Sequence, residues 1–172
     1  MNENKDRIPE NVGPGLLAKA SSWDEPGAPK PEFFSIRPQL LEAGNTEEPL
    51  SVADNLWVKV KVYAKGGENK LHAHPNQDHS FIVLDGVARF HGPRGEAREL
   101  GRNQGIMLPA GSYYWFETIS EAPLVLLRIG AVTGDGHPDA RTMDDGETKI
   151  RRGRNEIYIS PDVRYAEGKF YE

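Results

Sequence analysis

The stretch 71–86, "LHAHPNQDHSFIVLDG", decides how the rest of the chain is interpreted. It holds three of the five histidines in this chain of 172 residues: His72, His74 and His79. Side chains of a β-strand alternate between its two faces, so His72 and His74 should lie side by side on one face. The "PNQD" that follows is typical of a turn, so His79 should open an adjacent strand and bring its ring opposite the pair.

Three imidazoles that converge from two strands are a suitable donor set for a transition metal ion. The chain contains no cysteine, so any metal ligands must be nitrogen or oxygen donors. The alternative is that the first two histidines lie in a surface loop and that His79 forms a hydrogen bond in the core. The same alternation places Phe81 and Val83 on the face of His79, which predicts an apolar floor for the site.

Short runs of branched and aromatic residues fill the intervals between 18 glycines and 13 prolines. This spacing predicts many short strands that form a sandwich or a small barrel. An Asp-Gly pair ending at Gly86 predicts a hairpin between two of these strands. The predicted strands are 55–64, 79–85, 87–92, 104–111, 113–119 and 123–132.

The first of these strands, "NLWVKVKVYA" (55–64), alternates between three valines on one face and larger side chains on the other. The pattern predicts one buried face. Lys59, Lys61 and the later Arg128 are candidates to meet a substrate carboxylate, although an exposed strand face explains each of them more simply.

The two ends of the chain differ from its middle. Residues 1–30 are predicted to form an N-terminal arm that gains order by packing on the barrel or on a partner subunit. Residues 31–132 should form the barrel. Residues 133–172 form a polar C-terminal tail in which "EIYIS" (156–160) could add a strand.

Charge and hydropathy exclude several classes of protein. The net charge of −5 argues against nucleic-acid binding, and the basic cluster "KIRRGRNE" (149–156) is interpreted as a solvated turn. No apolar run is long enough to span a membrane, and the first residues contain no apolar export segment, so we expect a cytoplasmic protein.

Two stretches resemble the motifs of the cupin superfamily. The first motif, G(X)5HXH(X)3-4E(X)6G, is similar to the segment from Gly67 to Gly86, with His79 where the family usually has glutamate. The second, G(X)5PXG(X)2H(X)3N, is similar to "GRNQGIMLPAGSYYWFET" (101–118). Pro109 and Gly111 match there, whereas Tyr114 stands at the histidine position and Thr118 at the asparagine position. The resemblance covers roughly residues 52–132.

The resemblance implies an all-β fold, a cupin-like double-stranded β-helix (jelly-roll barrel) that carries the arm and the tail, and commonly a homodimer. It implies that His72, His74 and His79 bind one divalent transition metal, with Fe(II) favoured and Zn, Mn, Ni or Cu as alternatives. Tyr114 would either ligate the metal or, as we favour, stay unbound and donate a hydrogen bond to substrate or dioxygen.

The implied activity is that of a mononuclear non-heme iron dioxygenase acting on a small chelating organic substrate. Phe81, Val83 and Phe116 would form the apolar wall of its pocket, and Tyr114 would steer a proton or an oxygen intermediate. One alternative is a Zn- or Mn-dependent isomerase or lyase with Tyr114 as general acid or base. The other is a non-catalytic small-molecule-binding or metal-free cupin.

Overall fold

The computed structural model describes residues 21–65, 69–150 and 153–172, and within these ranges the chain forms fourteen β-strands and no helix. The fold class is therefore all-β, as predicted. Nothing in these ranges could cross a lipid bilayer as a helix. The strands are β1 (Gln39–Ala43), β2 (Asn45–Val52), β3 (Leu56–Tyr63), β4 (His72–Ala73), β5 (Gln77–Asp85), β6 (Ala88–His91), β7 (Ala97–Leu100), β8 (Gly105–Leu108), β9 (Trp115–Thr118), β10 (Leu124–Val132), β11 (Ala140–Met143), β12 (Thr148–Ile150), β13 (Tyr158–Ile159) and β14 (Arg164–Phe170).

The chain divides into two compact units, Met1–Phe33 and Phe34–Glu172. In the described part of the first unit, the rings of Trp23 and Phe33 meet edge to face with centroids 5.8 Å apart. The second unit contains all the strands and the candidate site. Gly67, where the first motif begins, lies outside the described residues.

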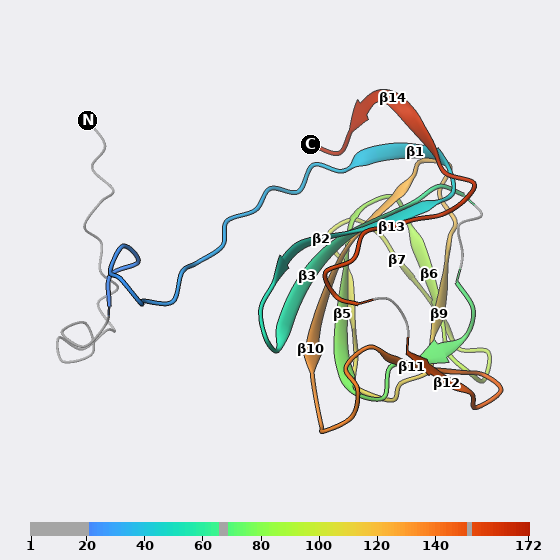
Figure 1. The fold of residues 1–172 in the computed structure, drawn as a ribbon. Helices are drawn as coiled ribbons and strands as arrows, with labels where there is room; N and C mark the ends of the chain where they lie inside the picture. Colours follow the sequence, from blue (N-terminus) through green and yellow to red (C-terminus); the bar gives the residue numbers. More distant parts are fainter. Residues whose placement is uncertain (1–20, 66–68, 151–152) are drawn as a thin grey trace. The chain divides into compact units, whose positions relative to one another are not determined.

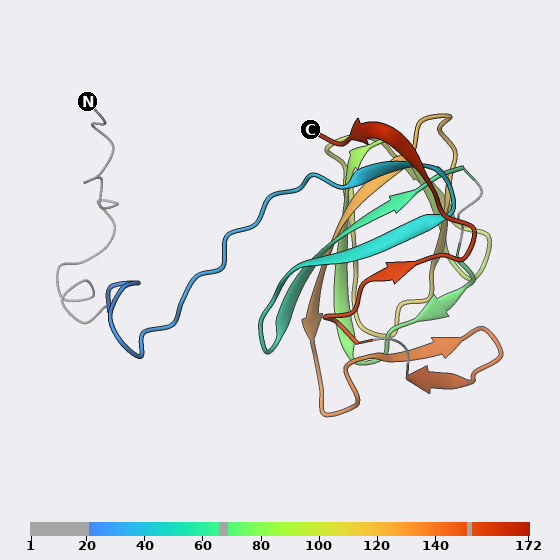
Figure 2. The same ribbon diagram turned by 45° about the horizontal axis from the view of Figure 1, so that its top comes forward.

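The second unit is built on a six-stranded antiparallel sheet with the strand order β13-β2-β3-β10-β5-β8. Figures 1 and 2 show the sheet β7-β6-β9 lying across from it. Between the two sheets lies a hydrophobic core that both of them supply, for example Phe81 and Leu126 from the large sheet and Phe90 and Phe116 from the small one. This core closes one end of the barrel.

The hairpin predicted at Gly86 does not form. β5 pairs with β10 and β8, whereas β6 pairs with β7 and β9, so the chain passes from one sheet to the other at this point. Gly86 has a φ of 77°, and a β-carbon there would lie 2.9 Å from the carbonyl oxygen of Pro123. The Asp-Gly pair thus predicts a sharp bend correctly, but the strand that follows it pairs in a different sheet.

Both faces of β3 are buried, where the alternating pattern predicted one. On the valine face, Val62 forms a small hydrophobic cluster with Leu41 and Ala64, and Val163 packs against this cluster. The opposite face, which carries both lysines, points into the barrel, and each lysine is less than 10% exposed. Lysines are almost never buried without partners, so this face must supply its own counter-charge. The inward side chains are Trp57, Lys59, Lys61 and Tyr63.

The polar tail is part of the folded unit. β11 pairs with β4, β13 pairs with β2, and β14 pairs with β1. The strand predicted within "EIYIS" is present as the short β13. These pairings bring five tail residues to the wall of a cavity in the barrel: Asp139, Arg141, Arg154, Glu156 and Tyr158.

Gly130 provides a test of the packing. It lies on β10 between Trp57 of β3 and His79 of β5, and a β-carbon there would overlap the Trp57 ring. We expect Gly130→Ala to lower the free energy of unfolding by about 1–3 kcal/mol, because the indole must move within a packed interior. Urea denaturation measures this, with Gly101→Ala as the control because its nearest neighbour would be 3.8 Å away. Equal losses in the two variants would contradict the packing described.

Candidate functional site

The three histidines of the opening stretch converge inside the barrel. The ring centroids of His72 and His74 are 5.0 Å apart, and those of His74 and His79 are 4.3 Å apart. His72 is 2% exposed and His79 is 1% exposed. β4 carries His72 and ends just before His74, whereas His79 lies on β5. These two strands are not paired, because β4 belongs to the sheet β12-β11-β4 and β5 to the six-stranded sheet. The rings therefore meet across the interior and not along one sheet.

Tyr114 joins this cluster from just before β9. Its backbone forms two hydrogen bonds with His72, of 2.9 and 3.1 Å, and the two rings are 4.6 Å apart. The phenol ring also packs on Phe81 within the hydrophobic core. Burial raises the pKa of Tyr114, so the side chain is a neutral phenol.

The histidines are neutral as well. Burial, reinforced by the charge of Arg141, lowers the pKa of His72 to about 2. Burial and the charge of Arg128 hold the pKa values of His74 and His79 well below their usual range. Neutral imidazole is the form that binds metals, so their protonation state suits ligation.

Two of the three rings also have suitable hydrogen bonding for a metal ligand. His72 Nδ1 lies 2.6 Å from the carbonyl oxygen of Lys70, which accepts its proton and leaves Nε2 with a lone pair. His74 Nδ1 is buried and has no hydrogen-bond partner. A metal ion or a ligand would satisfy it.

His79 does not fit this pattern. Its Nε2 lies 2.6 Å from Gln77 Oε1, and the Nη2 of Arg128 lies 3.0 Å from the same nitrogen and 3.4 Å from Nδ1. Within the described ranges, no three His, Asp or Glu side chains are placed so that they could hold a metal ion together. As arranged, the cluster does not fit a three-histidine metal centre. Ligation by His72, His74 and His79 stays a prediction.

A cavity of about 240 Å³ opens beside the cluster. Of the predicted metal ligands, the predicted catalytic tyrosine and the predicted pocket wall, only His74 lines it. Lys59, Lys61 and Arg128, the candidates to meet a substrate carboxylate, line it as well. Phe81, Val83 and Phe116, predicted as the pocket wall, are buried in the hydrophobic core. The lining is instead polar and charged: Asn45, Glu47, Trp57, Lys59, Lys61, Tyr63, Asn69, His74, Gln77, Arg128, Asp139, Arg141, Arg154, Glu156 and Tyr158.

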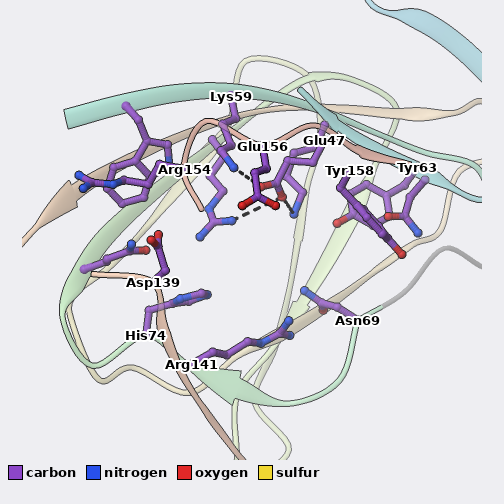
Figure 3. Close-up of a pocket in the computed structure, with 15 residues that line it drawn as sticks. Glu47, Lys59, Tyr63, Asn69, His74, Asp139, Arg141, Arg154, Glu156 and Tyr158 are labelled. Carbon is purple, nitrogen blue, oxygen red and sulfur yellow. Dashed lines mark hydrogen bonds and ion pairs between the residues drawn. The ribbon is translucent and has the colours of Figure 1, made fainter. Parts of the chain in front are cut away.

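One carboxylate at the cavity wall is shared by three cations (Figure 3). Glu47 accepts from Lys59 and Lys61 at 2.8 Å each and lies 3.5 Å from Arg128 Nη1. All four side chains are at most 16% exposed. The group carries two more positive than negative charges in a largely buried place.

The pKa values in this group follow from burial and from the shared carboxylate. Burial would raise the pKa of Glu47, but Lys61, Arg128 and Lys59 outweigh it and hold the pKa well below its usual range. Burial lowers the pKa of Lys59 despite the pull of Glu47. Burial also acts to lower the pKa of Lys61, but Glu47 outweighs it and the pKa is raised.

Sequence reasoning missed most of the other residues that line the cavity. Glu47 lies on β2 and was not predicted as a site residue. Asp139, Arg141, Arg154 and Glu156 belong to the tail, which was predicted to be polar and was given no role in the site. One available signal was the pattern "WVKVKVY", in which Trp57 and Tyr63 flank the two lysines on the same face and so indicate that this face is buried.

The charge of Glu47 should be essential for stability. We expect Glu47→Gln to lower the free energy of unfolding by about 3 kcal/mol at neutral pH, because three buried cations lose their shared carboxylate. The difference from wild type should be complete above the ordinary carboxyl pKa of 4.5 and should shrink as the pH falls through the lowered pKa of the folded state.

Urea denaturation across this pH range measures the effect. Glu48→Gln is the matched control, since the next residue of β2 points to the other face of the sheet and takes no part in the ion pairs between Glu47 and its three cations. Equal stability of the two variants at neutral pH would contradict the assigned role of Glu47.

Comparison with known proteins supports the fold. Residues 59–130 match the cupin domain family. Among solved structures, the cupin domain of Schizosaccharomyces pombe Cnp3 is 17% identical, with a TM-score of 0.50, over 55% of this chain and 76% of that one. A cupin superfamily protein from Desulfitobacterium hafniense is 16% identical over 52% and 78% of the two chains, with a TM-score of 0.46. KdgF from a Halomonas species is 17% identical over 51% and 79%, with a TM-score of 0.47.

No curated protein matches the chain. At these identities the structural likeness shows the fold alone. The family match covers β5 to β9 completely and all but the ends of β3 and β10, and it includes the three histidines and Tyr114. Residues 59–130 therefore form a cupin domain.

Proposed function

We propose that the barrel binds a small organic anion in the cavity beside the histidines. The observation that carries this proposal is the surplus of two positive charges in the group of Glu47, Lys59, Lys61 and Arg128. Burying a charge without a partner costs free energy. The fold leaves a surplus of positive charge at this wall, so an anion bound there is stabilised by electrostatic attraction.

The rest of the lining is consistent with a small carboxylate. The other charged side chains on the wall balance one another, since Arg141 and Arg154 are matched by Asp139 and Glu156. Figure 3 shows Lys59 and Glu47 on one side of the cavity and Arg141 across from them. The cavity, of about 240 Å³, is smaller than the roughly 300–1,000 Å³ of pockets for drug-sized ligands. We infer a ligand of a few carbon atoms.

His74 supports the same proposal. Its buried Nδ1 has no hydrogen-bond partner, and the side chain lines the cavity. A ligand held by the cations could present a hydroxyl or carbonyl group to this ring. The ligand would then satisfy the imidazole and, at the same time, be selected by it.

Matched pairs of acids and amides test the proposal. We expect succinate or pyruvate to raise the melting temperature, whereas succinamide and pyruvamide should not. A ligand present at 100 times its dissociation constant stabilises a protein by about 2.7 kcal/mol, which is roughly 5–11 °C for a domain of this size.

Lys61→Met identifies the cation involved. We expect it to weaken binding of the best acid by roughly 10–100-fold, since a charge-assisted hydrogen bond contributes about 1.5–3 kcal/mol. Lys149→Met is the control, because Lys149 pairs with Glu147 on the surface and does not line the cavity. Equal shifts with acids and amides, or equal affinity in the two variants, would refute the proposal.

A metal-dependent enzyme is the second candidate. The cupin superfamily includes enzymes, and the observation that favours this candidate is the state of His72 and His74, whose tautomer and unsatisfied nitrogen suit metal ligands. In the form predicted from the sequence it is an iron dioxygenase acting on a small chelating substrate, with His79 as third ligand.

Metal analysis separates the two candidates. If the enzyme proposal holds, protein purified without added metal contains about one iron per chain, consumes dioxygen with a diketone, diol or thiol, and loses the iron in His74→Ala. Tyr114→Phe should keep the iron and lower turnover. Absence of bound metal, or turnover without dioxygen uptake, would remove the dioxygenase candidate.

A further inference from the structure

We propose that the guanidinium of Arg128 occupies the position in the histidine cluster that a metal ion would need. The wild-type cluster is therefore metal-free. The proposal rests on where Arg128 lies and on what holds it there. It goes beyond anion binding, because cations at the cavity wall could bind an anion without touching a histidine.

Arg128 reaches the cluster from the centre of the large sheet. On β10 it is paired with Lys59 of β3 on one side and with Phe81 of β5 on the other. Its side chain is 11% exposed, and its guanidinium carbon lies 5.9 Å from the centre of the Phe81 ring. From this position Nη2 lies 3.0 and 3.4 Å from the two ring nitrogens of His79.

These contacts leave His79 no free nitrogen directed at a metal. An amide oxygen only accepts, so Nε2 donates its hydrogen to Gln77 Oε1, 2.6 Å away, and the lone pair of the ring lies on Nδ1. The guanidinium covers this nitrogen at 3.4 Å. A metal ligand needs a lone pair with open space about 2.0–2.1 Å beyond it. A divalent ion would also meet the fixed positive charge of Arg128 in a largely buried site, where screening is weak.

The charged group around Glu47 keeps Arg128 in place. Nη1 lies 3.5 Å from Glu47 Oε2, and Lys59 and Lys61 hold the same carboxylate at 2.8 Å. The guanidinium thus bridges this carboxylate and the ring of His79. One guanidinium nitrogen lies near Glu47 and the other near His79. These two contacts hold the guanidinium in one position, so it covers His79 throughout the folded protein.

Removing the guanidinium should therefore uncover a metal site. His72 and His74 are already neutral and hydrogen-bonded as ligands should be, and only the third imidazole is blocked. Glu47 keeps both lysines when Arg128 is replaced, so no unpaired carboxylate results.

The test compares Arg128→Met with wild type in Zn²⁺ titrations by calorimetry and in Co²⁺ titrations by visible absorption, using protein without a histidine tag. We expect weak binding to wild type and binding tighter by at least about 10–100-fold in Arg128→Met, the size of effect that groups contacting a ligand exert on metal affinity. Arg154→Met is the matched control, since it removes an equal charge from the cavity wall and leaves His79 untouched.

Adding His79→Ala to Arg128→Met should abolish the gain, which shows that His79 supplies the third donor. Cooperative unfolding confirms that each variant is folded, and Arg128→Gln serves if the methionine variant is not. Stoichiometric metal in wild type, an equal gain in Arg154→Met, or no gain in a folded Arg128 variant would overturn the proposal. Acid binding by wild type is measured separately, so its failure would count against the proposed ligand class alone.

Discussion

The carboxylate of Glu47 is the constraint on which the interior of this barrel depends. Three cations from two neighbouring strands lie against it, and none of them could be buried at reasonable cost without it. Through this group, β2, β3 and β10 are connected by charge as well as by their backbone ladder. The polar character of the cavity and the position of Arg128 follow from this cluster of charges, and the charge of Arg128 adds to burial in keeping His74 and His79 neutral.

Much of the fold could be predicted from local patterns. Alternating side chains located β3, β5 and β10 within two residues of their ends, and the spacing of glycine and proline indicated a barrel of short strands. The path between strands was harder to predict. An Asp-Gly pair specifies a bend, but the sheet that the chain enters after it depends on strands that are distant in the sequence, and here β6 pairs with β9 and not with β5.

The candidate site, like the fold, could be predicted only in part. The spacing of His72, His74 and His79 predicted that their rings converge, and they do. What surrounds the rings could not be predicted, because Glu47 and Arg128 lie 25 and 56 positions away from His72 in the sequence. Their approach depends on strand order, and a motif carries no information about that order. For the same reason, motif spacing could not predict that Phe81, next to His79, lies in the hydrophobic core and does not line the cavity.

The ladder between β1 and β14 has a consequence for how the chain folds. It pairs Gln39 with Phe170, and Arg37 and Glu172 form an ion pair just beyond it. Most of the other ladders also join strands that are distant in the sequence, such as β3 with β10 and β2 with β13. Closing such long loops costs conformational entropy before the contacts between the strands can form. This barrel should therefore fold in milliseconds to seconds. The pairing of β1 with β14 should form late in folding, because it closes the longest loop.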